Sequence, residues 1–188
     1  MNNFLSLTER VFPLWQPPVG DNNFKKVYVE YVIRNNIFKN NLQFELVDSA
    51  KNEFCAAAFF AGLGEHSLAE DWYDCAFKDF SLELKVAAAM CRTYLNYMDE
   101  KTFSLMGKDD VKLALFISLK PGSGSILLDS ICNDFKAKGR KNIFLWTDCE
   151  CDWQWYLKHG FELVEEDVYK AYSTEDRKYK TYIFKKEL

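Results

Sequence analysis

The feature that most constrains the fold is an apolar run, VKLALFISL at 111–119, followed by the loop KPGSGS at 120–125. A run this continuous is typical of a strand buried on both faces in the middle of a sheet. Beyond the loop, apolar residues from Ile126 to Phe135 recur at helical spacing, and Gly139 ends that helix. NIFLWT at 142–147 then predicts a second apolar strand. Strand, helix and strand in this order predict a right-handed βαβ unit with parallel strands.

Patterns elsewhere add further elements around this unit. Helical spacing predicts a helix over 22–36 and a helical stretch over 67–98 that breaks near Ser81. Alternating or continuous apolar residues predict further strands at 42–47, 54–63, 161–164 and 182–184. The predicted fold class is therefore α/β, a mixed sheet of six or seven strands flanked by helices. We expect one domain over 1–188, with a helical insertion at about 65–110.

Composition narrows the function classes. The chain has 188 residues and a formal net charge of −4, with 48% hydrophobic residues, so it is not a disordered chain. An acidic chain without basic-aromatic motifs is a poor nucleic-acid binder. The longest apolar run, 54–63, is too short to span a bilayer, and the N-terminus has no secretory pattern. We expect a cytoplasmic protein without nucleic-acid or membrane partners, and the sequence leaves a homodimer open.

The loop at 120–125 has the features of an anion site. Gly122 and Gly124 allow a sharp turn and close approach of a ligand, directly before a helix whose first N–H groups have no internal partner. Ser123 and Ser125 could add hydroxyl donors. A tight turn with a helix cap explains the same residues equally well. A Walker A motif is absent, and a dinucleotide fingerprint would need a third glycine where Leu127 stands.

Two further features bear on the dinucleotide-binding alternative, one in its favour and one against it. Asp148, after the next strand, could act as the ribose-binding acid of such a domain. Only about 40 residues follow Asp148, which is too few to complete a doubly wound sheet. We therefore keep this alternative below the others.

The stretch WYLKHGF, from Trp155 to Phe161, resembles the aromatic-Tyr-x-Lys-x-Gly-Phe signature of the GNAT acetyltransferase superfamily. The order of elements over about 111–165 is also similar to that of the superfamily. The resemblance implies two central parallel strands that splay apart and admit the pantetheine arm of acetyl-CoA or another acyl-CoA. It implies that this arm pairs with the backbone of the first splayed strand, at Phe116, Ile117, Ser118 and Leu119. The pyrophosphate would then sit on Lys120, Gly122, Ser123, Gly124 and Ser125, and Tyr156 would protonate the departing thiolate.

Three positions depart from the superfamily pattern. Leu119 stands where the loop usually has glutamine or arginine, and Pro121 lacks an N–H that could bind a phosphate. Cys149 replaces the asparagine that usually precedes the tyrosine by seven residues. These departures are compatible with weaker CoA binding or with a member that has lost catalysis. If the phosphate binds on this loop, Gly124→Val is expected to place a side chain where the phosphate lies.

The resemblance implies an N-acyltransferase that moves an acetyl group from acetyl-CoA to a primary amine by direct transfer. Direct transfer fits the absence of a serine or cysteine nucleophile motif. The alternative is a non-catalytic acyl-CoA-binding or interaction domain on the same fold. Glu65, Asp148 and Glu150 are equally open as bases for the amine. Cys149, Cys151 and His159 lack the spacing of a zinc site, so we expect no metal.

The insertion suggests a class of acceptor. From 67 to 100 seven acidic residues face three basic ones, whereas 111–141 has six basic residues against two acidic ones. A negative rim would attract a cation. We therefore expect a small-molecule or peptide amine as partner, and a solvated helix face is the competing explanation for the acidic residues.

Overall fold

The computed structural model describes residues 4–12, 15, 17–39, 42–67 and 69–188. The chain divides into two compact units, Met1–Asn41 with Glu65–Met98 and Leu42–Gly64 with Asp99–Leu188. The residues of the predicted insertion thus fall largely in the same unit as the N-terminal segment. One domain with an insertion stays a prediction.

The first unit is helical. It contains α1 (Phe4–Val11), α2 (Asn22–Asn35), α3 (Glu70–Phe77) and the first part of α4 (Leu82–Ser104). The carboxylate of Asp21 accepts the N–H of Phe24 at 2.9 Å and thereby caps α2. Aromatic side chains join α2 to α3, because the buried rings of Tyr31 and Tyr73 meet edge to face with centroids 4.9 Å apart. Phe77 packs against both rings.

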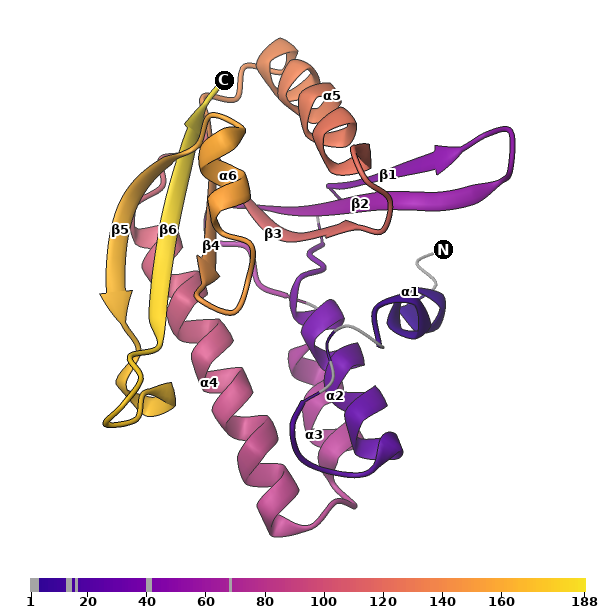
Figure 1. Ribbon diagram of the computed structural model, residues 1–188, viewed down its shortest axis with the longest axis vertical. Coiled ribbons are helices and arrows are strands. Elements are labelled where there is room, and N and C mark those ends of the chain that lie inside the picture. The colour runs from indigo at the N-terminus through magenta and orange to yellow at the C-terminus, as the bar shows by residue number, and fades with distance from the viewer. Residues whose placement is uncertain (1–3, 13–14, 16, 40–41, 68) are drawn as a thin grey trace. The chain divides into compact units, whose positions relative to one another are not determined.

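The second unit is built on a six-stranded sheet in the order β1-β2-β3-β4-β6-β5 (Figure 1). Its strands are β1 (Gln43–Asp48), β2 (Glu53–Gly62), β3 (Val111–Ser118), β4 (Asn142–Asp148), β5 (Glu162–Val168) and β6 (Lys180–Glu187). Its helices are α5 (Ser123–Ala137), α6 (Gln154–Lys158) and the 3-10 turn η1 (Lys170–Tyr172). Neighbouring strands are antiparallel except β3 and β4, which are parallel and joined through α5.

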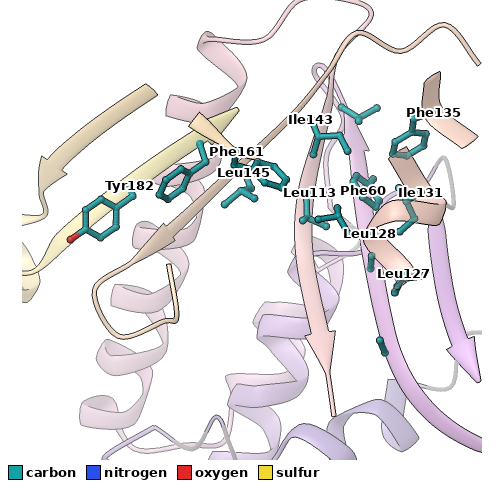
Figure 2. Close-up of a cluster of buried hydrophobic side chains, with 14 residues drawn as sticks. Phe60, Leu113, Leu127, Leu128, Ile131, Phe135, Ile143, Leu145, Phe161 and Tyr182 are labelled. Carbon is teal, nitrogen blue, oxygen red and sulfur yellow. The ribbon is translucent and has the colours of Figure 1, made fainter. Parts of the chain in front are cut away.

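The core of this unit lies between the sheet and α5, which packs on β1, β2 and β3. Figure 2 shows the α5 residues Leu128 and Ile131 beside Phe60 of β2 and Leu113 of β3. Phe135 completes this face of α5, and its ring meets that of Phe60 edge to face at 4.9 Å. Burial of one such side chain is worth about 1.5–3 kcal/mol, so this cluster holds α5 firmly on the sheet.

The opposite face of β3 carries a charge. Lys112 lies between Val111 and Leu113, which both belong to the core under α5, so its side chain points to the other face. There its ammonium nitrogen lies 2.5 Å from Oδ1 of Asp99 in the last turns of α4. Trp146 of β4 donates its indole N–H to the same oxygen at 2.6 Å. One carboxylate therefore links β3 and β4 on this face.

The predicted α/β class and the mixed sheet are confirmed, with six of the six or seven strands expected and one correction in α5. This helix begins at Ser123, inside the predicted loop, and its buried face is formed by Leu127, Leu128, Ile131 and Phe135. Ile126 falls outside that face and is 61% exposed, so its assignment to the buried stripe was wrong. Leu68, at the start of the predicted helical stretch 67–98, lies outside the described residues. No helix among the described residues is long and apolar enough to cross a membrane.

Candidate active site

The two parallel strands diverge soon after they begin. β3 and β4 pair only at Val111 with Ile143 and at Lys112 with Phe144. Beyond that point β3 stays paired with β2 as far as Ser118, while β4 stays paired with β6 to its end. Figure 1 shows β3 turning away under α5 while β4 continues beside β6. The facing edges of the two strands are therefore not paired with each other over most of their length.

A bulge in β3 accompanies the divergence. In the register with β2, Phe59 faces Leu115 but the next residue, Phe60, faces Leu113, so Ala114 is the extra residue. A bulge of this kind bends its strand and increases the local twist. Ala114 follows the last β3–β4 pair closely, and the bend thus occurs where the two strands separate.

The register also decides which β3 residues face the gap. The N–H of Leu119 donates to the carbonyl of Cys55 at 2.9 Å, and Ile117 pairs with Ala57 two positions along. Residues of an antiparallel pair alternate in hydrogen bonding, so the backbone groups of Ile117 and Leu119 point to β2. Those of Phe116 and Ser118 point to the gap. Of the four residues expected to pair with a pantetheine arm, only these two present free-edge backbone.

The loop after β3 is held together by Ser123. Its hydroxyl lies 3.1 Å from the carbonyl of Cys55, 2.7 Å from that of Lys120 and 3.0 Å from the hydroxyl of Ser118. The residue is buried. Its hydroxyl thus holds the loop together, whereas the sequence suggested it as a hydrogen-bond donor to a ligand.

The two glycines of the loop differ in role. Gly122 has φ +79°, a conformation that favours glycine, and a Cβ there would meet nothing within 4 Å. At Gly124 a Cβ would lie 3.3 Å from Oγ of Ser118 and 3.4 Å from the ring of Phe116. The side-chain direction at Gly124 therefore points into β3. The expectation that Gly124→Val would fill a phosphate position was wrong, because that side chain would collide with the strand.

The first turn of α5 offers unsatisfied donors. Ser123 and Ile126 donate their N–H groups to the carbonyls of Lys120 and Gly122. Within the described part of the chain, the N–H groups of Gly124 and Ser125 have no acceptor. Such groups at a helix start, with an open glycine before them, suit an anion.

Lys120, in the same loop, is paired with acids. Its ammonium donates to Oε2 of Glu53 at 2.6 Å and lies 3.9 Å from Oδ2 of Asp48. The hydrogen bond with Glu53 raises the pKa of Lys120, and the same contact lowers the pKa of Glu53. The charge of this lysine is thus largely balanced by the β1–β2 hairpin.

Tyr156 lies on α6, which follows β4. Its ring packs edge to face on Phe161 at 5.5 Å and against Phe184 at 6.0 Å. Burial, foremost, raises the pKa of the Tyr156 hydroxyl, with the nearby Cys151 and Asp152 adding to the shift. The hydroxyl therefore stays protonated at neutral pH, as a proton donor must.

A chain of contacts crosses from β3 to α6 and on to α5. The Phe116 ring lies 5.5 Å from that of Trp155, which stacks on His159 at 3.7 Å. His159 Nε2 lies 2.8 Å from the hydroxyl of Ser125, and its Nδ1 lies 2.8 Å from the carbonyl of Trp155. Sequence reasoning missed this link, because no local pattern relates Ser125 to His159.

The carboxyl end of β4 carries two of the three acids left open as bases. Asp148 is buried and accepts the hydroxyl of Tyr179 at 2.8 Å and the N–H of Glu150 at 3.0 Å. Glu150 is paired with Arg177. Of these two, Asp148 has the fixed position at the strand end. Glu65 belongs to the other unit.

Leu119 and Cys149, two of the positions that depart from the superfamily pattern, both donate their backbone N–H groups to neighbouring strands. The N–H of Leu119 completes the β2–β3 ladder, and its side chain is partly exposed. The N–H of Cys149 donates to the carbonyl of Lys180 at 2.9 Å, which extends the β4–β6 ladder by one residue. Both residues thus contribute backbone bonds to the sheet.

By sequence, the chain matches no protein-family model and no curated protein. The C-terminal condensation domain of Ebony in complex with beta-alanyl-dopamine superposes with a TM-score of 0.55 at 11% identity, over 96% of this chain and 86% of that one. Mosquito arylalkylamine N-acetyltransferase like 5b gives 0.51 at 14% identity, over 100% and 96%. An acetyltransferase of the GNAT family from Streptococcus pneumoniae gives 0.49 at 13% identity, over 97% and 90%. Its two central parallel strands separate after two residue pairs, and it aligns over its whole length with a solved structure named as an N-acetyltransferase, so the chain has the fold of the GNAT acetyltransferase superfamily.

Proposed function

We propose that this chain transfers an acyl group from acyl-CoA, with acetyl-CoA as the first candidate, directly to a primary amine. The observation that carries the proposal is the divergence of β3 and β4 next to the open first turn of α5. A gap with free-edge backbone suits an extended amide-containing arm, and the turn suits a pyrophosphate.

The described residues fit this donor in part. The N–H groups of Gly124 and Ser125 would hold the pyrophosphate, and the backbone of Phe116 and Ser118 would pair with the pantetheine amides. Gly122 leaves open space for the approach. The donor supplies a thioester, which makes the acyl group reactive toward an amine.

Tyr156 would hold the proton that the departing sulfur takes up. Its hydroxyl belongs to a partly buried side chain and carries a proton at neutral pH, so it has a proton to donate. Asp148 would accept the proton of the amine, directly or through water, because its carboxylate is fixed at the carboxyl end of β4. No covalent acyl-protein step is needed, so positioning would supply most of the rate.

For the acceptor we propose a small cationic amine, and arylalkylamines are the first to test. Two proteins of similar fold are named for an arylalkylamine or hold a dopamine derivative. The excess of acidic over basic residues at 67–100 is the second reason for proposing a cationic acceptor, although Glu70 and Asp74 are partly neutralised by Arg92. Asp99 of α4, one of the seven acidic residues at 67–100, is instead buried against Lys112.

A second candidate is an acyl-CoA-binding domain without turnover. Lys120 is occupied by Glu53, and Leu119 and Pro121 supply no side-chain or N–H donor to a phosphate. These features would weaken the binding of acyl-CoA, because fewer groups of the loop can bind its phosphates.

The test is calorimetry with CoA, followed by chromatographic detection of CoA released from acetyl-CoA in the presence of tryptamine, dopamine or spermidine. Ser125→Asp is the informative variant, because an acid in the first turn favours helix α5 but repels a pyrophosphate. Loss of CoA affinity by about ten-fold or more with unchanged thermal stability would support the site. Binding without turnover would favour the second candidate, and absence of binding by the wild type would reject both.

A further inference from the structure

The imidazole of His159 is fixed at both nitrogens. The carbonyl of Trp155 can only accept a hydrogen bond, so Nδ1, 2.8 Å away, must carry the ring proton of the neutral histidine. Nε2 is then the acceptor, and the hydroxyl of Ser125 donates to it across 2.8 Å. The two hydrogen bonds thus select one tautomer and one direction for the Ser125 hydroxyl.

Helix α6 depends on such ties for its orientation. It has five residues, and a helix this short is not stable by itself. Trp155 stacks on His159 and meets Phe116 of β3. Lys186 of β6 donates to the carbonyl of His159 at 2.7 Å. The helix is therefore held from β3, α5 and β6 together.

We propose that His159 is a positioning residue, which holds Tyr156 at a fixed place relative to the first turn of α5. The inference rests on the proposed function, because the two ends of the link are the proposed phosphate-binding turn, at Ser125, and the proposed proton donor. Tyr156 directly follows Trp155, whose ring and carbonyl both contact His159. A loss of this link would displace the hydroxyl of Tyr156 from the sulfur of a donor bound on α5.

Acyl transfer between bound groups depends steeply on distance, and a misplacement of about 1 Å can cost about a hundred-fold in rate. The stack and two hydrogen bonds on His159 restrict the very helix on which such a displacement would occur. His159 itself has no need to touch the donor or the acceptor.

One measurement tests the link without any reference to activity. Long-range proton–nitrogen correlation spectra of the ¹⁵N-histidine-labelled protein report which ring nitrogen carries the proton. We expect neutral His159 to be the Nδ1–H tautomer, the minor form of free histidine. A dominant Nε2–H tautomer in the wild type would overturn the proposed geometry.

Two substitutions separate the hydrogen bonds. A glutamine amide reaches roughly the position of Nε2 and an asparagine amide roughly that of Nδ1. His159→Gln therefore can keep the bond to Ser125, whereas His159→Asn keeps only the bond to Trp155. We expect kcat to fall about ten-fold in His159→Asn while the Kd for CoA changes less than about two-fold. His159→Gln should retain kcat within about three-fold of the wild type.

A double-mutant cycle identifies the shared bond. Ser125→Ala should lower kcat about ten-fold as well, and the double variant Ser125→Ala/His159→Asn should again lose about ten-fold rather than a hundred-fold. Ser125→Ala also changes the proposed donor site, so its Kd for CoA is expected to rise separately. His66→Gln is the matched control, because His66 is exposed and is the other of the two histidines in the chain.

The outcomes distinguish the inference from the function on which it rests. Multiplicative effects of the two substitutions, or an unchanged kcat in His159→Asn, would reject the positioning role in an otherwise active enzyme. A wild type that neither binds CoA nor transfers acetyl groups would reject the proposed function and this role together. A kcat loss confined to variants that break the Ser125–His159 bond, with the CoA affinity of His159→Asn intact, would support it.

Discussion

The ammonium group of Lys112 lies 2.5 Å from the carboxylate of Asp99, and the lysine side chain is fully buried. The same carboxylate oxygen accepts the indole N–H of Trp146. Lys112 is the last residue at which β3 pairs with β4, and Trp146 lies further along β4. Asp99 therefore joins the two central strands, through Lys112 of β3 and Trp146 of β4, next to the point where they separate.

Asp99→Ala should destabilise the fold strongly. It leaves the Lys112 charge buried without its partner, and breaking a buried pair in this way costs about 3–5 kcal/mol. Urea denaturation measures the difference. Asp134→Ala is the matched control, because it breaks the largely exposed Asp134–Lys138 pair and should cost less than about 1 kcal/mol. Equal losses in the free energy of unfolding would show that the buried pair stabilises the fold no more than the exposed pair.

The buried lysine predicts a pH dependence of stability. Burial lowers the pKa of Lys112 below its ordinary value of 10.5, although the attraction of Asp99 opposes the shift. The unfolded chain therefore takes up this proton at a higher pH than the folded one. As pH falls from about 11, the free energy of unfolding of the wild type should decrease relative to Lys112→Met, until folded Lys112 is protonated too. A pH-independent difference between the two proteins would contradict the shift.

Tyr156→Phe removes the proposed proton donor and keeps the ring that packs on Phe161. We expect kcat to fall by about 10²–10⁴-fold, the usual contribution of a general acid, with little change in CoA affinity. Stopped-flow kinetics would confirm that chemistry limits the rate. Tyr97→Phe, at a partly exposed position on α4, is the control. An unchanged kcat in a regime where chemistry is limiting removes Tyr156 from the mechanism.

Glu53→Gln should strengthen CoA binding. The substitution removes the nearer of the two acids beside Lys120 and leaves its ammonium with only the longer contact to Asp48, in the proposed phosphate loop. We expect the Kd for CoA to fall by about two- to five-fold at low salt and the gain to shrink as salt is raised. Glu45→Gln, on the exposed side of β1, makes the same change in net charge. An equal gain in both variants would mean that only overall charge matters.

Asp71→Asn combined with Asp79→Asn tests the acidic rim. Both residues are exposed, and neither has an ion pair within the described part of the chain, unlike Glu70. If the rim steers a cationic acceptor, kcat/KM for spermidine should fall by about two- to five-fold, and added salt should erase the difference. Asp129→Asn combined with Asp176→Asn is the control. A preference of the wild type for neutral or anionic amines would make the charge argument wrong.

Local sequence patterns were sufficient to predict the main helices and strands. The continuous run at 111–119 and the helical spacing after it predicted β3 and α5, because buried strands and one-sided helices differ in the period of their apolar residues. The stretch WYLKHGF singled out Tyr156, which lies on α6. Ends of elements were predicted less well. The start of α5 was missed by three residues, since Ser123 is held by a carbonyl of β2, which no local pattern reveals.

The candidate site was decided largely by contacts between distant segments. The sequence by itself determined that a glycine loop precedes α5 and that Tyr156 follows β4. Only the tertiary structure decided that Lys120 faces Glu53, that Lys112 meets Asp99 and that Ser125 bonds His159. Apolar periodicity is a local property that follows from burial of one face. The partner of a charge or hydroxyl depends on which strand register and helix packing bring two segments together, and the residue types alone do not encode that choice.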